Sequence, residues 1–148
     1  MSDSVEFNPI TLPEQYVKAG KGSGLQPIEV TRYLDCDLGN TWKYLTRCEF
    51  KGAKCQDMGK ALWYLDDYRN HFIDYNNDST IVHNIPAEIV DKMCKFIELT
   101  EQPEIKHILE QVMMIATQNG ILDPKLLDQY MFELEEYRKT FLEYKPYK

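Results

Sequence analysis

The chain has 148 residues, of which 43% are hydrophobic and 28% charged, and its net charge is −7 at pH 7. A chain of this length predicts one domain with a sizeable core, and its acidic balance argues against general nucleic-acid binding. No apolar stretch is long enough to cross a bilayer, and the start MSDSVEF lacks the basic and apolar runs of a signal peptide, so we expect a cytoplasmic protein with no membrane contact.

The N-terminal part of the chain is polar and contains several glycines. Residues 1–12 show no periodicity, and we predict a flexible tail there. Residues 18–24 read KAGKGSG, which does not match the P-loop pattern of Gly-x4-Gly-Lys-Ser/Thr after a strand. This segment is either a plain linker or a mobile lid whose backbone N–H groups and Lys21 would face phosphate.

A short helix is predicted over residues 27–34. Pro27 suits its first position, and Glu29 falls in its first turn, where the helix dipole alone favours an acidic residue. Asp37 is then a candidate N-cap for the following helix, because an aspartate can accept a hydrogen bond from a free backbone N–H at a helix start.

Residues 38–65 read LGNTWKYLTRCEFKGAKCQDMGKALWYL and predict two helices joined by a short basic turn. At about 100° per residue, each helix separates an apolar side from a polar side. The apolar sides comprise Leu38, Trp42, Leu45 and Cys48 in the first helix, and Met58, Ala61, Leu62, Leu65 and Phe72 in the second. The polar sides comprise Asn40, Lys43, Tyr44, Arg47 and Lys51, and then Asp57, Lys60, Tyr64, Tyr68 and His71. If the apolar sides pack together, the polar sides flank one groove.

This groove would be cationic although the whole chain is acidic. Residues 43–60 contain five lysines and arginines and two acidic residues, which is a net charge of +3. A local cationic cluster on an acidic protein favours a specific anionic ligand, and an arginine such as Arg47 can bind phosphate through two hydrogen bonds. The alternative is a solvated helical hairpin with ordinary surface lysines.

Three further helices are predicted after a break at residues 76–79. Pro86 opens the first, the second spans residues 105–116, and the third follows Asp123, with Pro124 at its first position. The third helix carries apolar and aromatic residues at heptad spacing, which suit either packing inside a bundle or a contact between subunits. These residues are Leu127, Tyr130, Leu134, Tyr137, Phe141 and Tyr144.

These elements predict an all-α fold, a helical bundle of about six helices, because no credible strand is found. We divide it into a helical region over residues 13–78, which contains the short hairpin, and a C-terminal three-helix region over residues 79–148, a candidate for oligomerisation. The four cysteines and three histidines do not stand at zinc-ligand spacing, so no metal site is predicted from them.

Two blocks of the hairpin carry a recognisable pattern. Gly39, Asn40, Lys43, Tyr44 and Arg47 form the first, Lys51 and Gly52 lie in the turn, and Asp57, Lys60, Ala61, Tyr64 and Leu65 form the second. These blocks resemble the bacteriophage SaV-like family of nucleotide kinase-like proteins over about residues 13–72. The family's Pro-x-His-Tyr opening corresponds to PEQY at residues 13–16, where Gln15 replaces the histidine and Tyr16 matches.

The resemblance implies a phage protein of the host cytoplasm that binds the phosphates of a nucleotide. It implies cations for the phosphates and tyrosines for the base, and the candidate ligand-binding residues are Tyr16, Asn40, Lys43, Tyr44, Arg47, Lys51, Lys60 and Tyr64. If the protein phosphorylates nucleoside monophosphates, Asp57 and Glu29 are the candidate catalytic carboxylates, and either could hold Mg²⁺.

Two non-catalytic functions stay open beside phosphoryl transfer. The same cations could sequester a nucleotide, such as a host defence signal, without any general base. The acidic C-terminal half could instead bind and inhibit a host protein in counter-defence. We also expect a homo-oligomer, because a groove on two helices is shallow and a second copy could close it.

Overall fold

The computed structural model describes residues 24–50, 53–73, 81–117 and 123–148, and no strand occurs among them. The α-helices are α2 (Ile28–Thr31), α3 (Cys36–Arg47), α4 (Lys54–Tyr68), α5 (Ala87–Leu99), α6 (Pro103–Thr117) and α7 (Pro124–Arg138). A 3-10 turn, η1 (Cys48–Phe50), follows α3, and a π-helical turn, η2 (Arg69–Ile73), follows α4. The predicted all-α bundle of about six helices is confirmed. No helix within the described ranges is long and apolar enough to span a membrane.

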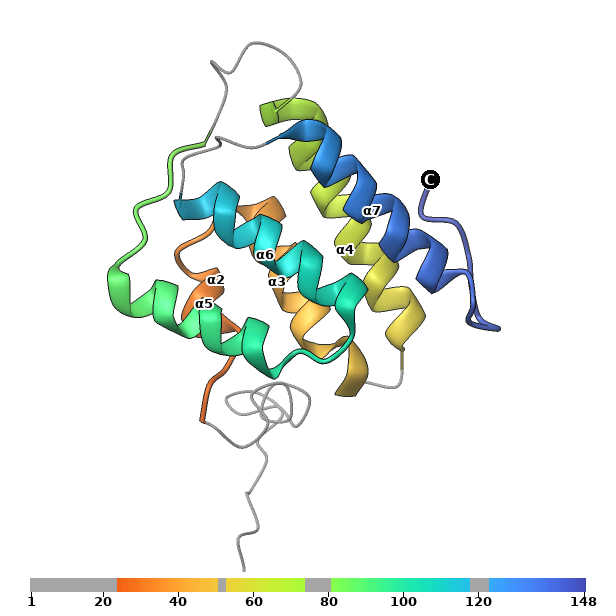
Figure 1. Cartoon of the computed structure of the whole chain (residues 1–148), viewed down its shortest axis with the longest axis horizontal. Coiled ribbons are helices and arrows are strands. Elements are labelled where there is room, and N and C mark those ends of the chain that lie inside the picture. Colours follow the sequence, from red (N-terminus) through yellow and green to blue (C-terminus); the bar gives the residue numbers. More distant parts are fainter. Residues whose placement is uncertain (1–23, 51–52, 74–80, 118–122) are drawn as a thin grey trace, which may run out of the picture.

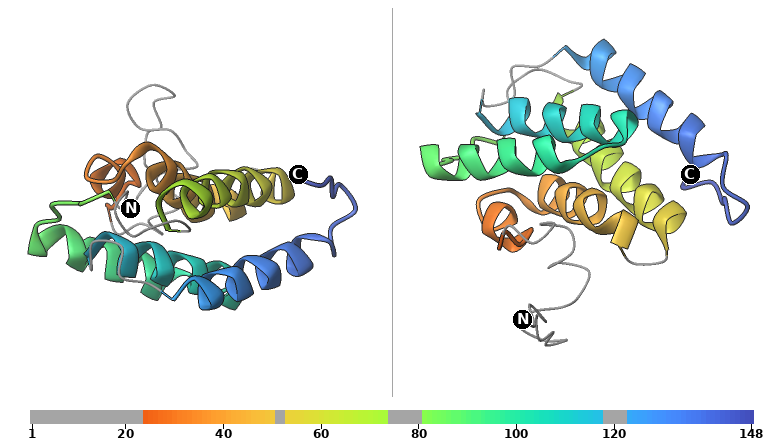
Figure 2. Two further views of the ribbon diagram at one scale, coloured as in Figure 1. Left: turned by 90° about the horizontal axis from the view of Figure 1, so that it is seen from above. Right: turned by 60° about the horizontal axis from the view of Figure 1, so that its bottom comes forward.

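The six α-helices of the described residues form two layers of three. In one layer α2, α3 and α4 are neighbours, and in the other α5, α6 and α7 are neighbours (Figure 1; left view of Figure 2). Contacts between the layers pair the helices in chain order: α2 with α5, α3 with α6, and α4 with α7. A single hydrophobic core fills the space between the layers and takes side chains from both.

Large apolar side chains join the two layers. The Trp42 indole of α3 meets the Phe96 ring of α5 edge to face, with centroids 6.0 Å apart and an interplanar angle of 88°. Leu62 of α4 and Leu134 of α7 are fully buried, and burying one such side chain contributes about 1.5–3 kcal/mol. The residues predicted for the apolar sides of the hairpin, from Leu38 to Leu65, are all buried, as the helical periodicity predicts. Tyr68, predicted for the polar side of the second helix, is also fully buried in the core, so that placement is wrong.

The last helix ends earlier than the heptad pattern predicts. Leu127 is fully buried in the chain's own core, but α7 ends at Arg138, so Phe141 and Tyr144 lie beyond it. The prediction of one helix carrying all six heptad residues is therefore wrong. The chain turns after α7 and runs back beside it (Figure 1), because the buried Arg138 side chain binds the backbone carbonyl of Lys145.

The start of α3 also differs from the prediction, because its N-cap is Asp35 and not Asp37. Asp35 Oδ1 accepts a hydrogen bond from the Leu38 backbone N–H at 3.0 Å, which satisfies one free donor of the first turn. The other oxygen lies 2.6 Å from Nε2 of His83, in the segment that precedes α5. This contact ties the start of α3 to the second layer.

Asp37 lies in the first turn of α3 and faces Asp67 of α4. Burial, the hydrogen bond with Asp67 and the negative charges of Asp67 and Asp35 raise the pKa of Asp37 to about 7, against a weaker opposing effect of His71. The folded protein therefore holds this proton more tightly than the unfolded chain does. The resulting stabilisation is fully present below about pH 4 and is lost as the pH rises through about 7.

We predict that Asp37→Asn raises the melting temperature more at pH 8 than at pH 5. The amide keeps a hydrogen bond to Asp67 but cannot ionise. The variant therefore avoids the loss of stability that ionisation of Asp37 causes in the wild type at high pH. Thermal unfolding followed by circular dichroism at both pH values measures the difference from the wild type. Asp91→Asn, at an exposed position of α5, is the control and should show no such dependence. An equal shift for Asp37→Asn at both pH values would contradict the prediction.

Candidate ligand-binding site

Packing of α3 against α4 brings five of the predicted site residues together. The two helices share the most extensive contact of any pair, and the Thr41 hydroxyl lies 3.4 Å from the Ala61 carbonyl, an approach that the small side chain of Ala61 permits. Residues three or four positions apart share one helix face, so the polar sides of both helices meet at this seam. We call the residues gathered there the tyrosine–cation cluster: Lys43, Tyr44, Arg47, Lys60 and Tyr64.

The Tyr44 ring is the centre of the cluster. Lys43 Nζ and Arg47 Cζ each lie 4.7 Å from its centroid, and Lys60 Nζ lies 5.3 Å away. The Tyr64 ring is nearly parallel to it, at 14°, with centroids 6.1 Å apart. Cations within about 6 Å of an aromatic centroid are attracted to the ring. Partial burial and the nearby Tyr44, Cys36 and Asp37 raise the pKa of Tyr64. Its phenol, like any tyrosine of ordinary pKa, is protonated at neutral pH and can donate a hydrogen bond.

The charges of the cluster are only partly balanced. Within the described residues, neither Lys43 nor Lys60 forms an ion pair with a carboxylate. Arg47 pairs with Asp57 of α4, with 3.5 Å between Nε and Oδ2. The cluster with its partner therefore carries three positive charges and one negative charge, and the two lysines supply the excess.

Arg47 and Asp57 lie deeper than the helical wheel suggests. Arg47 is only 7% exposed and Asp57 is fully buried. Arg47 Nε lies 3.5 Å from Asp57 Oδ2, so a metal ion at this carboxylate would compete with the guanidinium. Asp57 instead orients Arg47 against the Tyr44 ring.

Glu29, the second candidate carboxylate, makes its contacts away from the cluster. Its Oε2 accepts a hydrogen bond from the Gln26 backbone N–H at 2.6 Å, and its Oε1 lies 3.1 Å from Lys92 Nζ of α5. Burial alone would raise the pKa of Glu29, but the Gln26 hydrogen bond and the Lys92 ammonium outweigh it and lower the pKa below its usual value. Glu29 thus joins α2 to α5.

The remaining predicted ligand-binding residues are not part of the cluster as the structure describes it. The Asn40 amide donates to the Cys36 carbonyl of its own helix at 2.9 Å. Tyr16 and Lys51 fall outside the described residues. The residues described around the seam therefore provide cations and phenols, and no exposed carboxylate among the predicted ones joins them.

A pocket of about 610 Å³ adjoins the cluster on the other side of Lys60. It lies between α4 and the segment that follows α7, and we call it the tail pocket. Its lining includes Gln56, Gly59, Lys60, Trp63, Glu143 and Lys145. Sequence reasoning missed this pocket, because no local pattern indicates that the C-terminal segment returns to α4. The one available signal was Trp63, a large aromatic residue off the apolar side of its helix.

The comparisons with known proteins concern the first layer. Residues 10–66 match a family model described as a protein of unknown function (DUF3310). The match covers less than half of the chain, but it includes α2, α3, most of α4 and every residue of the tyrosine–cation cluster. No match was found among the curated proteins or the solved structures.

Proposed function

We propose that the protein binds the phosphate groups of a nucleotide at the tyrosine–cation cluster. The observation that carries this proposal is the convergence of three cations on one tyrosine ring in a protein whose net charge is −7. Like charges held this close repel each other, and a bound polyanion would relieve that repulsion. The resemblance to nucleotide kinase-like phage proteins supports phosphate as the anion.

The proposal is for binding without turnover. Of the two candidate carboxylates, Asp57 is buried behind Arg47 and Glu29 is held by Lys92. A general base must lie within hydrogen-bonding reach of the proton that it removes, and neither carboxylate is free to do so in this arrangement. Sequestration of a nucleotide needs only the cations and the phenols, so the geometry favours it over phosphoryl transfer.

We predict that Lys43→Ala and Lys60→Ala each weaken the binding of ATP and of inorganic triphosphate at least tenfold. A hydrogen bond to a charged group contributes about 1.5–3 kcal/mol, and tenfold corresponds to about 1.4 kcal/mol. Isothermal titration calorimetry measures the affinities, and circular dichroism verifies that each variant is folded. Lys95→Ala removes an exposed lysine of α5 and should bind both ligands as the wild type does.

The double variant Lys43→Ala/Lys60→Ala gives the sharpest test of the proposed phosphate site. It removes the two cations that have no carboxylate partner among the described residues and leaves the buried Arg47–Asp57 pair in place, so the fold should be retained. Wild-type affinity for triphosphate in this folded double variant would refute the proposal.

A further inference from the structure

The tail pocket and the tyrosine–cation cluster are connected through Lys60. This side chain lines the pocket and also lies 5.3 Å from the Tyr44 ring. The pocket volume of about 610 Å³ falls within the range of about 300–1,000 Å³ that is usual for small-molecule sites. A ligand whose anionic end contacts Lys60 therefore has room for a further group on the pocket side.

An aromatic path leads from the cluster into the pocket. The Trp63 indole is 53% exposed although it is among the largest apolar groups of the chain. It meets the Tyr64 ring edge to face, with centroids 5.2 Å apart at 87°, and Tyr64 in turn lies parallel to Tyr44. The exposed Trp63 indole thus offers a flat apolar surface next to Tyr64 of the tyrosine–cation cluster.

The rest of the pocket lining suits a flat ring with polar edges. Gln56 of α4 and Glu143 and Lys145 of the returning segment are exposed and line the pocket with Trp63. Between them these side chains provide both hydrogen-bond donors and acceptors. A purely aliphatic ligand would leave those groups unused, whereas the edge of a nucleobase presents donors and acceptors of its own.

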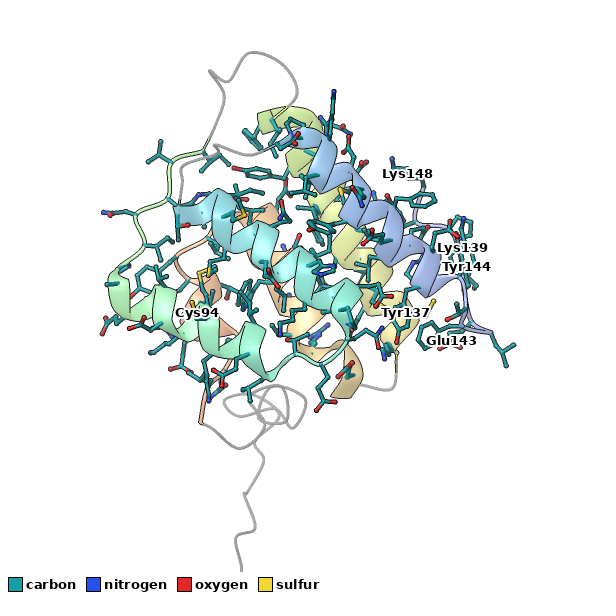
Figure 3. All side chains as sticks on the ribbon, viewed as in Figure 1. Cys94, Tyr137, Lys139, Glu143, Tyr144 and Lys148 are labelled. Atoms are coloured by element: carbon teal, nitrogen blue, oxygen red, sulfur yellow. The ribbon has the colours of Figure 1, made fainter. Side chains whose placement is uncertain are left out.

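The wall formed by the C-terminal segment is held by defined contacts. Arg138 donates from Nη1 to the Cys55 carbonyl of α4 at 3.1 Å and from Nη2 to the Lys145 carbonyl. A Cβ atom at Gly59 would lie 2.8 Å from Arg138 Nη1, so a larger residue there would displace the guanidinium. At the chain end, Lys148 Nζ pairs with Asp66 of α4 at 3.2 Å. Figure 3 shows Glu143 and Tyr144 near the end of α7 and Lys148 farther back along the helix.

We infer that the tail pocket binds the base of the nucleotide whose phosphates contact the tyrosine–cation cluster, with the base stacked on Trp63. This inference rests on the proposed function, because Lys60 is the link between the two parts of the site. It identifies the ligand as a nucleotide rather than a free polyphosphate. It also assigns the C-terminal segment, which lies far from the family-matched residues in the chain, a direct part in ligand recognition.

The test compares ATP with inorganic triphosphate in the wild type and in Trp63→Ala. Stacking of a base on an aromatic side chain strengthens binding, so the wild type should bind ATP at least about fivefold more tightly than triphosphate. Trp63→Ala should lose this preference while its triphosphate affinity stays unchanged. Trp63→Phe keeps an aromatic face and should restore part of the preference. Phe132→Ala, which removes another exposed ring outside the tail pocket, is the matched control.

Fluorescence gives a second readout of the same contact. The chain has two tryptophans, and Trp42 is fully buried, so ATP should quench mainly the exposed Trp63 and triphosphate should not. Triphosphate binding with no preference for ATP, or a preference that survives in Trp63→Ala, would overturn the inference and leave the phosphate proposal standing. Failure of both ligands to bind the wild type would overturn both.

Discussion

Replacing Arg47 with methionine should lower the free energy of unfolding by about 3–5 kcal/mol. The change leaves the Asp57 carboxylate fully buried and without the guanidinium that now lies 3.5 Å from it. Removing one partner of a buried ion pair typically has this cost, because the remaining charge is neither solvated nor neutralised. Urea unfolding followed by circular dichroism measures the change. An unaltered m-value would show that the variant and the wild type expose the same amount of surface on unfolding.

The double variant Arg47→Met/Asp57→Leu distinguishes the ion pair from simple packing. Leucine has nearly the shape of aspartate, and replacing a buried pair by apolar residues is often neutral for stability. We therefore expect the double variant to recover most of the stability that Arg47→Met loses. A double variant that is less stable than Arg47→Met would show that the pair is not the cause. Lys43→Met, on the same helix, should change stability by less than about 0.5 kcal/mol.

The second large effect is expected at Arg138, where methionine should lower the free energy of unfolding by about 3 kcal/mol. Arg138 is 2% exposed and joins three parts of the chain: Glu135 of its own helix, the Cys55 carbonyl of α4 and the Lys145 carbonyl. Burial opposes its charge, but the hydrogen bond and the negative charge of Glu135 prevail and raise the pKa of Arg138. Its removal leaves buried acceptors unpaired, at about 1–3 kcal/mol each.

Denaturant unfolding of three variants separates the contribution of the Arg138 charge from that of its hydrogen bonds. Arg138→Lys keeps the charge but cannot reach several acceptors at once, so its stability should fall between the wild type and Arg138→Met. Lys139→Met alters the next residue, which is exposed, and should be nearly neutral. If Arg138→Met lowers the free energy of unfolding by less than about 1 kcal/mol, the guanidinium is not what holds the C-terminal segment after α7.

The stability predictions limit how the ligand site can be tested. Because Arg47 supports the fold, weak binding in an Arg47 variant would not separate lost contacts from lost structure. Lys43 and Lys60 have no carboxylate partner among the described residues, so their removal reports on the ligand with less risk to the fold. Trp63, being half exposed, has the same advantage in the tail pocket.

Much of the first layer could be predicted from the sequence. Helical periodicity over residues 38–65 placed Leu38, Trp42 and Leu62 on the packed sides and Lys43, Tyr44 and Lys60 on the polar sides, and the structure brings these lysines and Tyr44 together. The start of α3 was less predictable. The N-cap was predicted at Asp37, whereas the structure places it at Asp35, which also contacts the distant His83.

The role of Asp57 shows why a candidate site could not be read completely from spacing. On a helical wheel Asp57 shares a face with Lys60 and Tyr64, which made it a candidate catalytic carboxylate. In the structure it is fully buried under Arg47. A wheel gives the direction of a side chain about one helix axis but not the depth at which a neighbouring helix covers it.

The sequence by itself determined the all-α class, the helices of the hairpin and the local excess of positive charge, because these depend on residues a few positions apart. Only the tertiary structure decided that helices α2 to α7 form two layers, that Arg138 fastens the C-terminal segment to α4, and that Trp63 and Lys145 line one pocket. These features depend on contacts between residues about 80 positions apart, such as Cys55 and Arg138. Such contacts form only when the whole core is assembled, and no local pattern encodes them.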